Sequence, residues 1–192
     1  MPNTSPLYRA LTHAAVPLAS LALRDGRQRA AHAARLASPA SMEAWAIGHR
    51  DASRPLAWFH ASSVGEGLQA RAVMHAYRRL QPAAQIIYTH YSPSASTLAV
   101  SIGADWAGYL PYDRPGDVAR ALRAVRPTLL VFSKLDLWPE LATQAQQRGC
   151  RVAIVAGTVT PDSGRLRWPI RALAAPGYRA VDVIGAIASA DA

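Results

Sequence analysis

The sequence predicts an α/β protein with a Rossmann-like parallel sheet and flanking helices. From residue 56 onward, six short β-rich runs alternate with helical patterns. This order requires parallel strands joined by right-handed crossovers. The 192 residues suffice to bury one core. An apolar content of 51% with 17% charged residues is typical of a globular chain.

An apolar run at residues 10–23 precedes the predicted sheet and contains His13 and Pro17. It is shorter than the roughly 20 residues that a bilayer-spanning helix needs. Arginines flank it on both sides: Arg9, Arg24, Arg27, Arg29 and Arg35. Three interpretations stay open: a short amphipathic anchor at an anionic membrane surface, a helix packed on the domain, or a signal peptide. The flanking arginines favour the first.

Residues 38–55 are rich in Ser, Pro and Gly and are expected to form a loose connection, with a short helix around 43–47. We therefore divide the chain at residue 55. Residues 1–55 are expected to hold the membrane-associating helix and a basic connector, and residues 56–192 the Rossmann-like domain.

Within that domain, strands are expected where apolar and β-branched residues cluster: 57–60, 85–90, 106–110, 128–132, 151–156 and 181–187. Helices are expected where apolar residues recur at helical spacing or where proline opens a turn: 66–80, a short helix ending at 100, 118–125, 139–148 and 168–174. The stretch before the last helix carries Pro161 and Gly164 and is expected to be looser.

The chain is organised around the stretch Ala57-Trp-Phe-His-Ala-Ser-Ser-Val-Gly-Glu66, which reads as strand, turn and helix. That turn lies at the carboxyl edge of the sheet, where open α/β sheets bind ligands. Glu66 is the only Glu between positions 44 and 139, and we predict that it is a catalytic base. The predicted ligand-binding residues come from the same edge: Ser63, Gly65, Thr89, Ser92, Ser94, Lys134 and Asp136.

Several of these residues also have a structural interpretation. Ser63 and Glu66 have the spacing of a capping box, and a carboxylate held in its own cap is a weaker base. Ser92 and Ser94 flank Pro93, as at a turn followed by a helix start. Both interpretations stay open for each segment.

The loop after the fourth predicted strand has alternatives as well. Lys134 and Asp136 form either an ion pair bordering a site or an ordinary surface pair. His60 fits a hydrogen-bonded core histidine, and Trp138 fits a packed residue at a helix start.

The net charge of +9 favours anionic partners, such as a membrane surface or a phosphorylated substrate. The basic residues are not interleaved with aromatic residues on strands, so we expect no nucleic-acid partner. Cys150 is the only cysteine, which excludes an internal disulfide and a Cys-based zinc site. The six histidines lack ligand spacing, so we expect no metal and no cofactor.

Four segments together resemble the amino-terminal domain of bacterial 3-deoxy-D-manno-octulosonic acid (Kdo) transferases. They are His-Ala-Ser-Ser-Val-Gly-Glu at 60–66, Thr-His-Tyr-Ser-Pro-Ser-Ala at 89–95, Tyr-Leu-Pro-Tyr-Asp-Arg-Pro at 109–115 and Leu-Trp-Pro at 137–139. Their order and spacing are those of the family. The apolar run followed by arginines resembles the short membrane-associating segment with which the family begins.

The resemblance implies the amino-terminal, acceptor-binding half of a GT-B glycosyltransferase of lipopolysaccharide biosynthesis. Such an enzyme transfers Kdo from CMP-Kdo to a lipid A precursor, with inversion and without an obligatory metal, at the cytoplasmic face of the inner (plasma) membrane. By the same resemblance, Glu66 deprotonates the acceptor hydroxyl. The carboxyl-terminal donor domain is expected to be absent from this chain, which alone is expected to be inactive. The alternative is a non-catalytic Rossmann-like module that binds an anionic glycolipid or a partner protein.

The chain departs from the family pattern at two places. Lys134-Leu135-Asp136 stands where the family usually has Glu-Thr-Glu, and Ala156-Gly157-Thr158 stands where it has Asn-Ala-Arg. These departures indicate a divergent branch with altered contacts to the acceptor.

Overall fold

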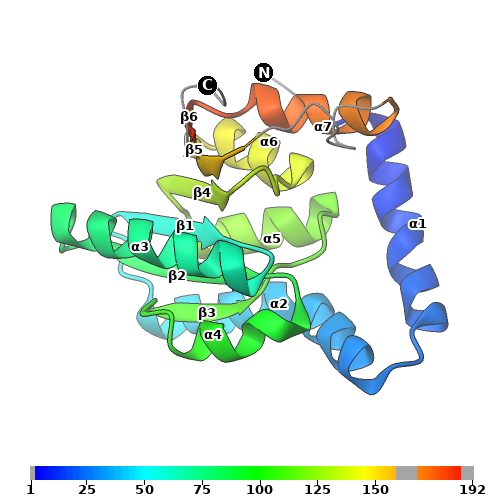
Figure 1. Ribbon diagram of the computed structural model, residues 1–192, viewed down its shortest axis with the longest axis horizontal. Coiled ribbons are helices and arrows are strands. Elements are labelled where there is room, and N and C mark those ends of the chain that lie inside the picture. Colours follow the sequence, from blue (N-terminus) through cyan, green and yellow to red (C-terminus); the bar gives the residue numbers. More distant parts are fainter. Residues whose placement is uncertain (1–2, 159–167, 187–192) are drawn as a thin grey trace.

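The computed structural model describes residues 3–158 and 168–186, and in them it shows one parallel sheet between layers of helices (Figure 1). The strands are β1 Leu56–His60, β2 Gln85–His90, β3 Trp106–Tyr109, β4 Leu129–Ser133, β5 Arg151–Gly157 and β6 Val183–Ala186. Their order in the sheet is β3-β2-β1-β4-β5-β6, and every neighbouring pair is parallel. The predicted Rossmann-like fold is therefore confirmed.

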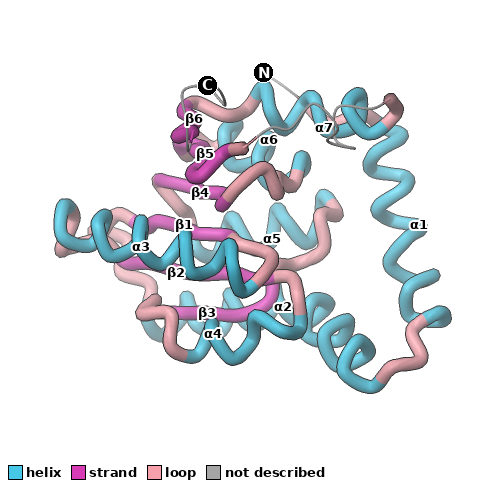
Figure 2. The backbone as a smooth tube through the Cα atoms, viewed as in Figure 1, coloured by secondary structure: helices cyan, strands magenta, loops and turns pink. Residues whose placement is uncertain are grey.

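Helices alternate with the strands after β1, as the tube in Figure 2 shows. The described helices are α1 Pro6–Ala22, α2 Gly26–His49, α3 Val64–Leu80, α4 Ser96–Val100, α5 Pro115–Val125, α6 Pro139–Gln147 and α7 Ile170–Arg179, with a short 3-10 helix at Pro93–Ala95. Side chains alternate between the two faces of a strand. Leu56 and Trp58 of β1 pack in one core with α2, α5 and α6, whereas Ala57 and Phe59 pack in a second core with α3 and α4.

The prediction of a loose connection at 38–55 is wrong, because α2 runs without a break to His49. The short helix expected at 43–47 is the last part of this longer one. One face of α2 is buried, at Ala31, Arg35, Ser38 and Met42. These positions recur at intervals of four, three and four, which places them on one stripe facing α5 and β3. Packing of this stripe outweighs the helix-breaking tendency of Pro39, which lies inside the helix.

The carboxyl-terminal elements differ less from expectation. Helix α7 extends to Arg179, beyond the predicted 168–174. The predicted loose stretch around Pro161 and Gly164, and the last predicted strand residue at 187, lie outside the described residues. Among the described helices, none combines the length and the apolar character needed to cross a bilayer.

Helix α1 lies beside the edge at which the strands end (Figure 1). Near its start, the Tyr8 hydroxyl donates to Asp113 at 2.6 Å. Near its end, the Ser20 hydroxyl lies 2.6 Å from His32 Nε2 of α2. Both contacts are made to segments at the carboxyl edge, so α1 spans that edge.

Candidate functional site

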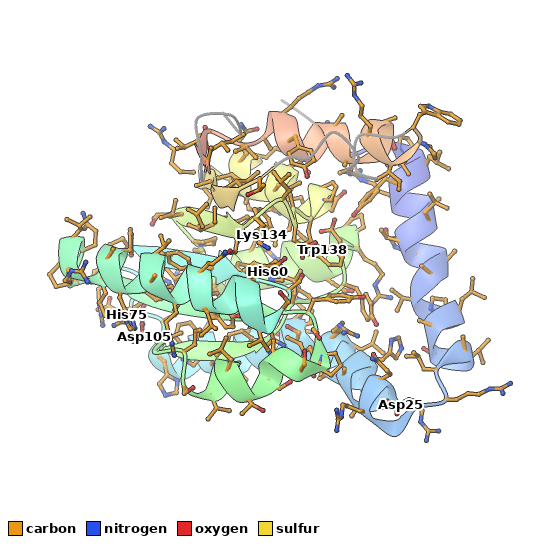
Figure 3. All side chains as sticks on the ribbon, in the orientation of Figure 1. Asp25, His60, His75, Asp105, Lys134 and Trp138 are labelled. Atoms are coloured by element: carbon orange, nitrogen blue, oxygen red, sulfur yellow. The ribbon has the colours of Figure 1, made fainter. Side chains whose placement is uncertain are left out.

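The strand order reverses between β1 and β4, which are neighbours in the sheet although two strands separate them in sequence. From this pair the chain turns to opposite faces of the sheet, and in open α/β sheets such a reversal is where a ligand-binding crevice is expected, here between the turn after β1 and the loop after β4. Glu66 follows β1, and Lys134 and Asp136 follow β4. Figure 3 shows His60, Lys134 and Trp138 close to one another at this edge. The sheet therefore brings these predicted site residues to one place.

Glu66 closes the capping box at the start of α3. Its Oε2 accepts hydrogen bonds from the backbone N–H groups of Ser62 at 3.0 Å and Ser63 at 3.1 Å. The Ser63 hydroxyl in turn accepts from the Glu66 N–H at 3.4 Å. Both bonds to the carboxylate use Oε2, and within the described residues no hydrogen bond reaches Oε1. The cap is confirmed, and it leaves one carboxylate oxygen available to a ligand.

Space lies beside this first helical turn. A Cβ atom added to Gly65 would meet no atom within 4 Å. A Cβ added to Gly67 would come within 2.7 Å of the Tyr88 hydroxyl oxygen, so that glycine lets α3 pack on the sheet. Gly65 is thus the position at which a ligand can approach the backbone next to Glu66.

Asp136 joins the two sides of the crevice. Its Oδ2 accepts a hydrogen bond from the Ser62 hydroxyl and lies 3.5 Å from His60 Nε2. The Asp136 side chain is 22% exposed, whereas the His60 side chain is fully buried. The turn that carries Glu66 is therefore held against the loop after β4.

His60 is a hydrogen-bonded core histidine, as one interpretation of the sequence predicted. The Trp138 indole N–H donates to His60 Nε2 at 3.1 Å, so Nε2 is the acceptor nitrogen. The proton is then assigned to Nδ1, which donates to the Thr89 carbonyl oxygen at 3.1 Å. Thr89, a predicted binding residue, lies buried beneath this ring, and its hydroxyl accepts from the Trp58 indole at 2.8 Å. The network fixes His60 in one tautomer and one orientation.

Lys134 occupies a strained backbone position. Its φ is +56°, in the left-handed region that residues other than glycine rarely adopt. Its N–H donates to the Val155 carbonyl at 2.7 Å, and the neighbouring Ser133 hydroxyl donates to the Glu66 carbonyl at 3.1 Å. Strained backbone of this kind is concentrated at functional sites. The hydrogen bonds of Lys134 to β5 and of Ser133 to α3 therefore fix the backbone of Lys134 in this strained conformation at the crevice.

Ser92 and Ser94 form the predicted turn and helix start at the end of β2. Their hydroxyl oxygens are 2.8 Å apart, and Ser92 precedes the 3-10 helix that begins at Pro93. The Ser92 N–H donates to the Ser62 carbonyl at 2.8 Å. This bond brings the serine turn next to the turn that carries Glu66.

Arg35 and Tyr91 belong to the same edge, and sequence reasoning missed both. The Arg35 guanidinium lies 3.9 Å from the centre of the Tyr91 ring, which lies 5.0 Å from the Trp138 ring. In the sequence, Arg35 is one of the arginines that follow the apolar run, and it is therefore expected to face a membrane surface. Its spacing from Ala31 and Ser38 was the available signal, because it places Arg35 on the buried stripe of α2.

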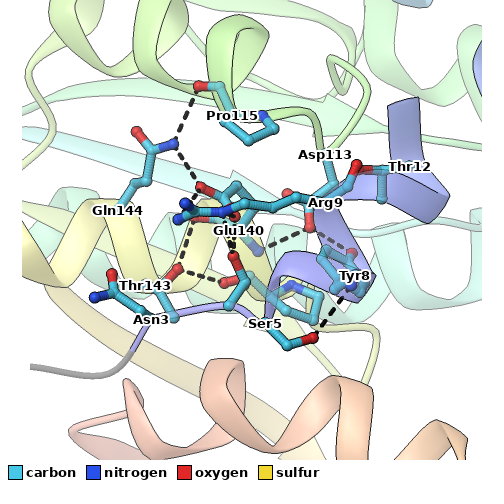
Figure 4. A network of polar contacts seen from close by, with 12 residues as sticks. Asn3, Ser5, Tyr8, Arg9, Thr12, Asp113, Pro115, Glu140, Thr143 and Gln144 are labelled. Carbon is cyan, nitrogen blue, oxygen red and sulfur yellow. Dashed lines mark hydrogen bonds and ion pairs between the residues drawn. The ribbon is translucent and has the colours of Figure 1, made fainter. Parts of the chain in front are cut away.

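A second polar network, drawn in Figure 4, attaches α1 to this edge. Asp113 accepts from the N–H groups of Glu140 at 2.8 Å and Leu141 at 2.9 Å, and so caps α6. Arg9 of α1 pairs with buried Glu140 through bonds of 3.0 and 3.1 Å. Burial raises the pKa of Asp113 to about 6, although the bonds from Tyr8 and the α6 backbone oppose the rise. The start of α1 is thereby fixed at the edge.

Burial governs the other titrating groups near the crevice. It raises the pKa of Tyr88 to about 12, and the charge of Glu66 adds to the rise. It lowers the pKa of His90 to about 4. Within 3–158 and 168–186, no three His, Cys, Asp or Glu side chains gather as a metal-binding group. The described arrangement offers a carboxylate, a lysine and hydroxyl groups, which suits proton transfer from a polar ligand.

Known proteins resemble this chain in sequence. A sequence model of the family described as "3-Deoxy-D-manno-octulosonic-acid transferase (kdotransferase)" matches residues 27–192. A "Probable 3-deoxy-D-manno-octulosonic acid transferase, mitochondrial" of Arabidopsis thaliana is 32% identical over 149 residues, covering 72% of this chain and 31% of that protein. A "3-deoxy-D-manno-octulosonic acid transferase" of Haemophilus influenzae is 27% identical over 117 residues, covering 60% of this chain and 27% of that protein. This chain therefore spans less than a third of these relatives.

Solved structures agree with the fold. A UDP-N-acetylglucosamine 2-epimerase superimposes with a TM-score of 0.50 at 9% identity, over 69% of this chain and 42% of that one. At this identity the match concerns the fold alone.

Proposed function

Because this chain belongs to the 3-deoxy-D-manno-octulosonic acid (Kdo) transferase family, we propose that it is the acceptor-binding half of a glycosyltransferase that moves Kdo from CMP-Kdo to a lipid A precursor. The observation that carries the proposal is the position of Glu66 at the point where the strand order reverses. A second domain of the GT-B architecture would bind the donor on the other side of the crevice. The residues of this chain alone would then bind the acceptor without turnover.

Glu66 acts as the general base in this proposal. A sugar hydroxyl is a poor nucleophile, and a positioned carboxylate typically contributes about 10²–10⁴-fold to its reaction. The Ser62 and Ser63 N–H groups hold Oε2, and Oε1 receives the hydroxyl proton. The acceptor oxygen forms a bond to the anomeric carbon of Kdo with inversion, while the bond from that carbon to the CMP phosphate oxygen breaks. CMP leaves as the anion, and Glu66 later returns its proton to solvent.

The neighbouring side chains bind and orient the acceptor. Lys134 and Asp136 lie on the loop after β4, and we assign them to polar contacts with the acceptor. The backbone at Gly65 provides the approach, and the serine turn after β2 borders it. Thr89 contributes indirectly, because it lies buried and orients His60.

We also propose that α1 binds the surface of an anionic membrane, at the cytoplasmic face of the inner membrane. Four leucines of α1 are exposed, with Leu18 at 63% and Leu21 at 84%. Leu7, Leu11, Leu18 and Leu21 recur at helical spacing and so form one stripe. Exposed arginines follow the stripe directly: Arg24, Arg27 and Arg29. An apolar stripe next to basic residues is typical of helices that lie in the membrane interface.

Vesicle flotation tests the membrane proposal. The chain is expected to float with anionic vesicles, and a Leu18→Ser, Leu21→Ser double variant is expected to bind at least tenfold more weakly. Leu80→Ser is the matched control, since Leu80 is equally exposed but lies at the end of α3. Equal binding by the double variant and the control would show that α1 is only a helix packed on the domain.

A transfer assay tests the role of Glu66. The chain is joined to a donor domain of the family, and transfer of Kdo to a lipid A precursor is followed by mass spectrometry. Glu66→Gln keeps a polar side chain at the cap and is expected to lower kcat by about 10²–10⁴-fold. Glu43→Gln, on the opposite side of the sheet where Glu43 pairs with Arg120, is expected to leave kcat unchanged. Full activity of Glu66→Gln would show that Glu66 only caps α3 and does not act as the base.

A further inference from the structure

Arg35 is a buried charge that the proposed reaction does not use. The residue is only 5% exposed. Its Nη2 donates to the Tyr91 carbonyl oxygen at 2.5 Å, but its Nε is buried without a hydrogen-bond partner in the described part of the chain. The ion pairs between described residues do not include Arg35. A buried charge without a counter-ion is costly, so its retention needs a reason.

The surroundings of Arg35 offset this cost only in part. The guanidinium lies 3.9 Å from the ring centre of Tyr91, 5.4 Å from that of Tyr109 and 6.0 Å from that of Tyr112. Aromatic faces attract a cation, but more weakly than a carboxylate does. The carboxylates that the structure places at this edge have other partners: Glu66 caps α3, Asp113 caps α6, and Glu140 pairs with Arg9. None of these three carboxylates forms an ion pair with Arg35.

We propose that Arg35 binds an oxyanion of the substrate, either a carboxylate or a phosphate group. A guanidinium presents five N–H donors in a planar fork that fits both groups, and the bond to Tyr91 uses one of them. The inference rests on the proposed function, which supplies two sources of such a group. One is the carboxylate of the octulosonic acid, and the other is a phosphate group on a glycolipid acceptor.

The position of Arg35 relative to Glu66 supports this role. Ring contacts and hydrogen bonds connect the two residues along the carboxyl edge. Arg35 lies on Tyr91, whose ring lies 5.0 Å from that of Trp138. Trp138 donates to His60, and His60 lies 3.5 Å from Asp136, which holds the turn of Glu66. The oxyanion subsite and the base thus lie at the two ends of one row of contacting residues along the carboxyl edge.

Tyr112 is the side chain that we assign to open the enclosure when a ligand binds. Its ring is half-buried, and its hydroxyl lies 2.5 Å from His32 Nδ1. His32 is held on its other side by Ser20 of α1. Side-chain rotations at binding sites commonly accompany ligand binding. An oxyanion reaches the guanidinium when the Tyr112 ring turns away from it.

Nuclear magnetic resonance of arginine side chains tests the subsite on the chain itself. In protein with ¹⁵N-labelled arginine, the Arg35 Nε–H signal is expected to shift saturably on titration with inorganic phosphate or with free Kdo, at ionic strength matched with chloride. A response to Kdo alone identifies the carboxylate as the source, and a response to phosphate alone identifies a phosphate group. If neither titration moves this signal more than chloride does, the proposal is wrong. The wild-type measurement decides even where a variant fails to fold.

Two variants locate the effect. Arg35→Met is expected to weaken binding of the responding anion at least tenfold, whereas Arg123→Met, which removes an exposed arginine at the opposite edge, leaves it unchanged. Equal binding by both variants would overturn the assignment. The readout is binding without transfer, so its failure is distinguishable from a failure of Glu66 in the transfer assay.

Discussion

The two edges of the sheet carry charge in opposite ways. At the carboxyl edge, α3 and α6 begin with Glu66 and Glu140, and the carboxylate of Asp113 caps α6. At the amino edge, arginines contact the ends of helices: Arg50 donates to the Val125 carbonyl at 2.7 Å, and Arg148 donates to the Gln144 carbonyl at 2.9 Å. Carboxylates thus lie at helix N-termini and guanidinium groups at helix C-termini, as the helix dipole favours.

This contrast changes what the net charge of +9 implies. The parallel fold collects helix C-termini at one edge, and the bonds that Arg50 and Arg148 make there account for these two charges without a polyanionic partner. Arg35 differs from these arginines, because it is a buried cation at the edge where helices begin and none of the described ion pairs includes it. The position of Arg35 is therefore more informative about a ligand than the net charge of the chain.

Cavities in the protein surface indicate the position of the site less well than the chemistry of the side chains does. A cavity of about 430 Å³ lies at the amino edge and is lined by Arg123, Arg126 and Arg148. Its lining includes no carboxylate or histidine, and these three arginines are exposed. The proposed reaction is assigned to the carboxyl edge, which carries the Glu66 carboxylate, Lys134 and the fixed His60, because proton transfer needs an acid–base group.

The largest effect on stability is expected from His90 of the carboxyl edge. Burial holds its pKa at about 4 in the folded chain, against 6.5 for an unperturbed histidine. The unfolded chain therefore takes up a proton below pH 6.5 that the folded chain does not, and stability falls as the pH drops toward 4. The loss amounts to at most about 3 kcal/mol.

Chemical denaturation at pH 7 and pH 5 measures this loss. His90→Gln is expected to reduce the difference between the two values, whereas His75→Gln, at an exposed position on α3, leaves it unchanged. The comparison between variants is needed because Asp113, with a raised pKa, contributes with the opposite sign. An unaltered difference in His90→Gln would mean that His90 is not kept neutral by the fold.

A smaller effect is expected from Trp138. Phenylalanine at this position removes the N–H that His60 Nε2 accepts, and leaves that buried nitrogen without its donor. The expected loss is about 1–3 kcal/mol in the free energy of unfolding. Trp45→Phe on α2 is the control, since that partly buried indole packs outside the network, and we expect it to cost less. If both variants lost the same stability, the hydrogen bond would contribute nothing beyond packing.

The smallest effect is expected at the amino edge, and it is a gain. Arg126 ends α5 with φ at +46°, where glycine is the preferred residue. Arg126→Gly relieves this strain and is expected to raise stability by about 1 kcal/mol. Arg126→Ala removes the same charge but keeps the Cβ atom, so no gain is expected. Stabilisation by alanine equal to that by glycine would assign the effect to charge repulsion instead.

The fold could be predicted from the sequence further than the site. Alternating β-rich and helical patterns were enough to predict the strands and their parallel direction. The parallel sheet in turn predicts that Glu66, Lys134 and Asp136 lie at one edge. Helix α2 was missed because Ser38 and Pro39 are turn residues in most settings, and packing on α5 decided otherwise. The bonds of His60 and the burial of Arg35 join residues far apart in sequence. Only the folded chain shows such partners.

Chemical rescue tests the role of the carboxyl edge most directly. In the chain joined to a donor domain of the family, Glu66→Ala removes the carboxylate and leaves room beside Gly65, where an added Cβ meets nothing within 4 Å. Transfer is expected to fall by about 10²–10⁴-fold and to recover in part with added formate, which can accept the acceptor proton. Glu66→Gln fills the space and is expected to show no recovery. The opposite result is a Glu66→Ala variant that transfers Kdo at the wild-type rate, with no change of this rate on addition of formate. Glu66 would then be a helix cap and not a base.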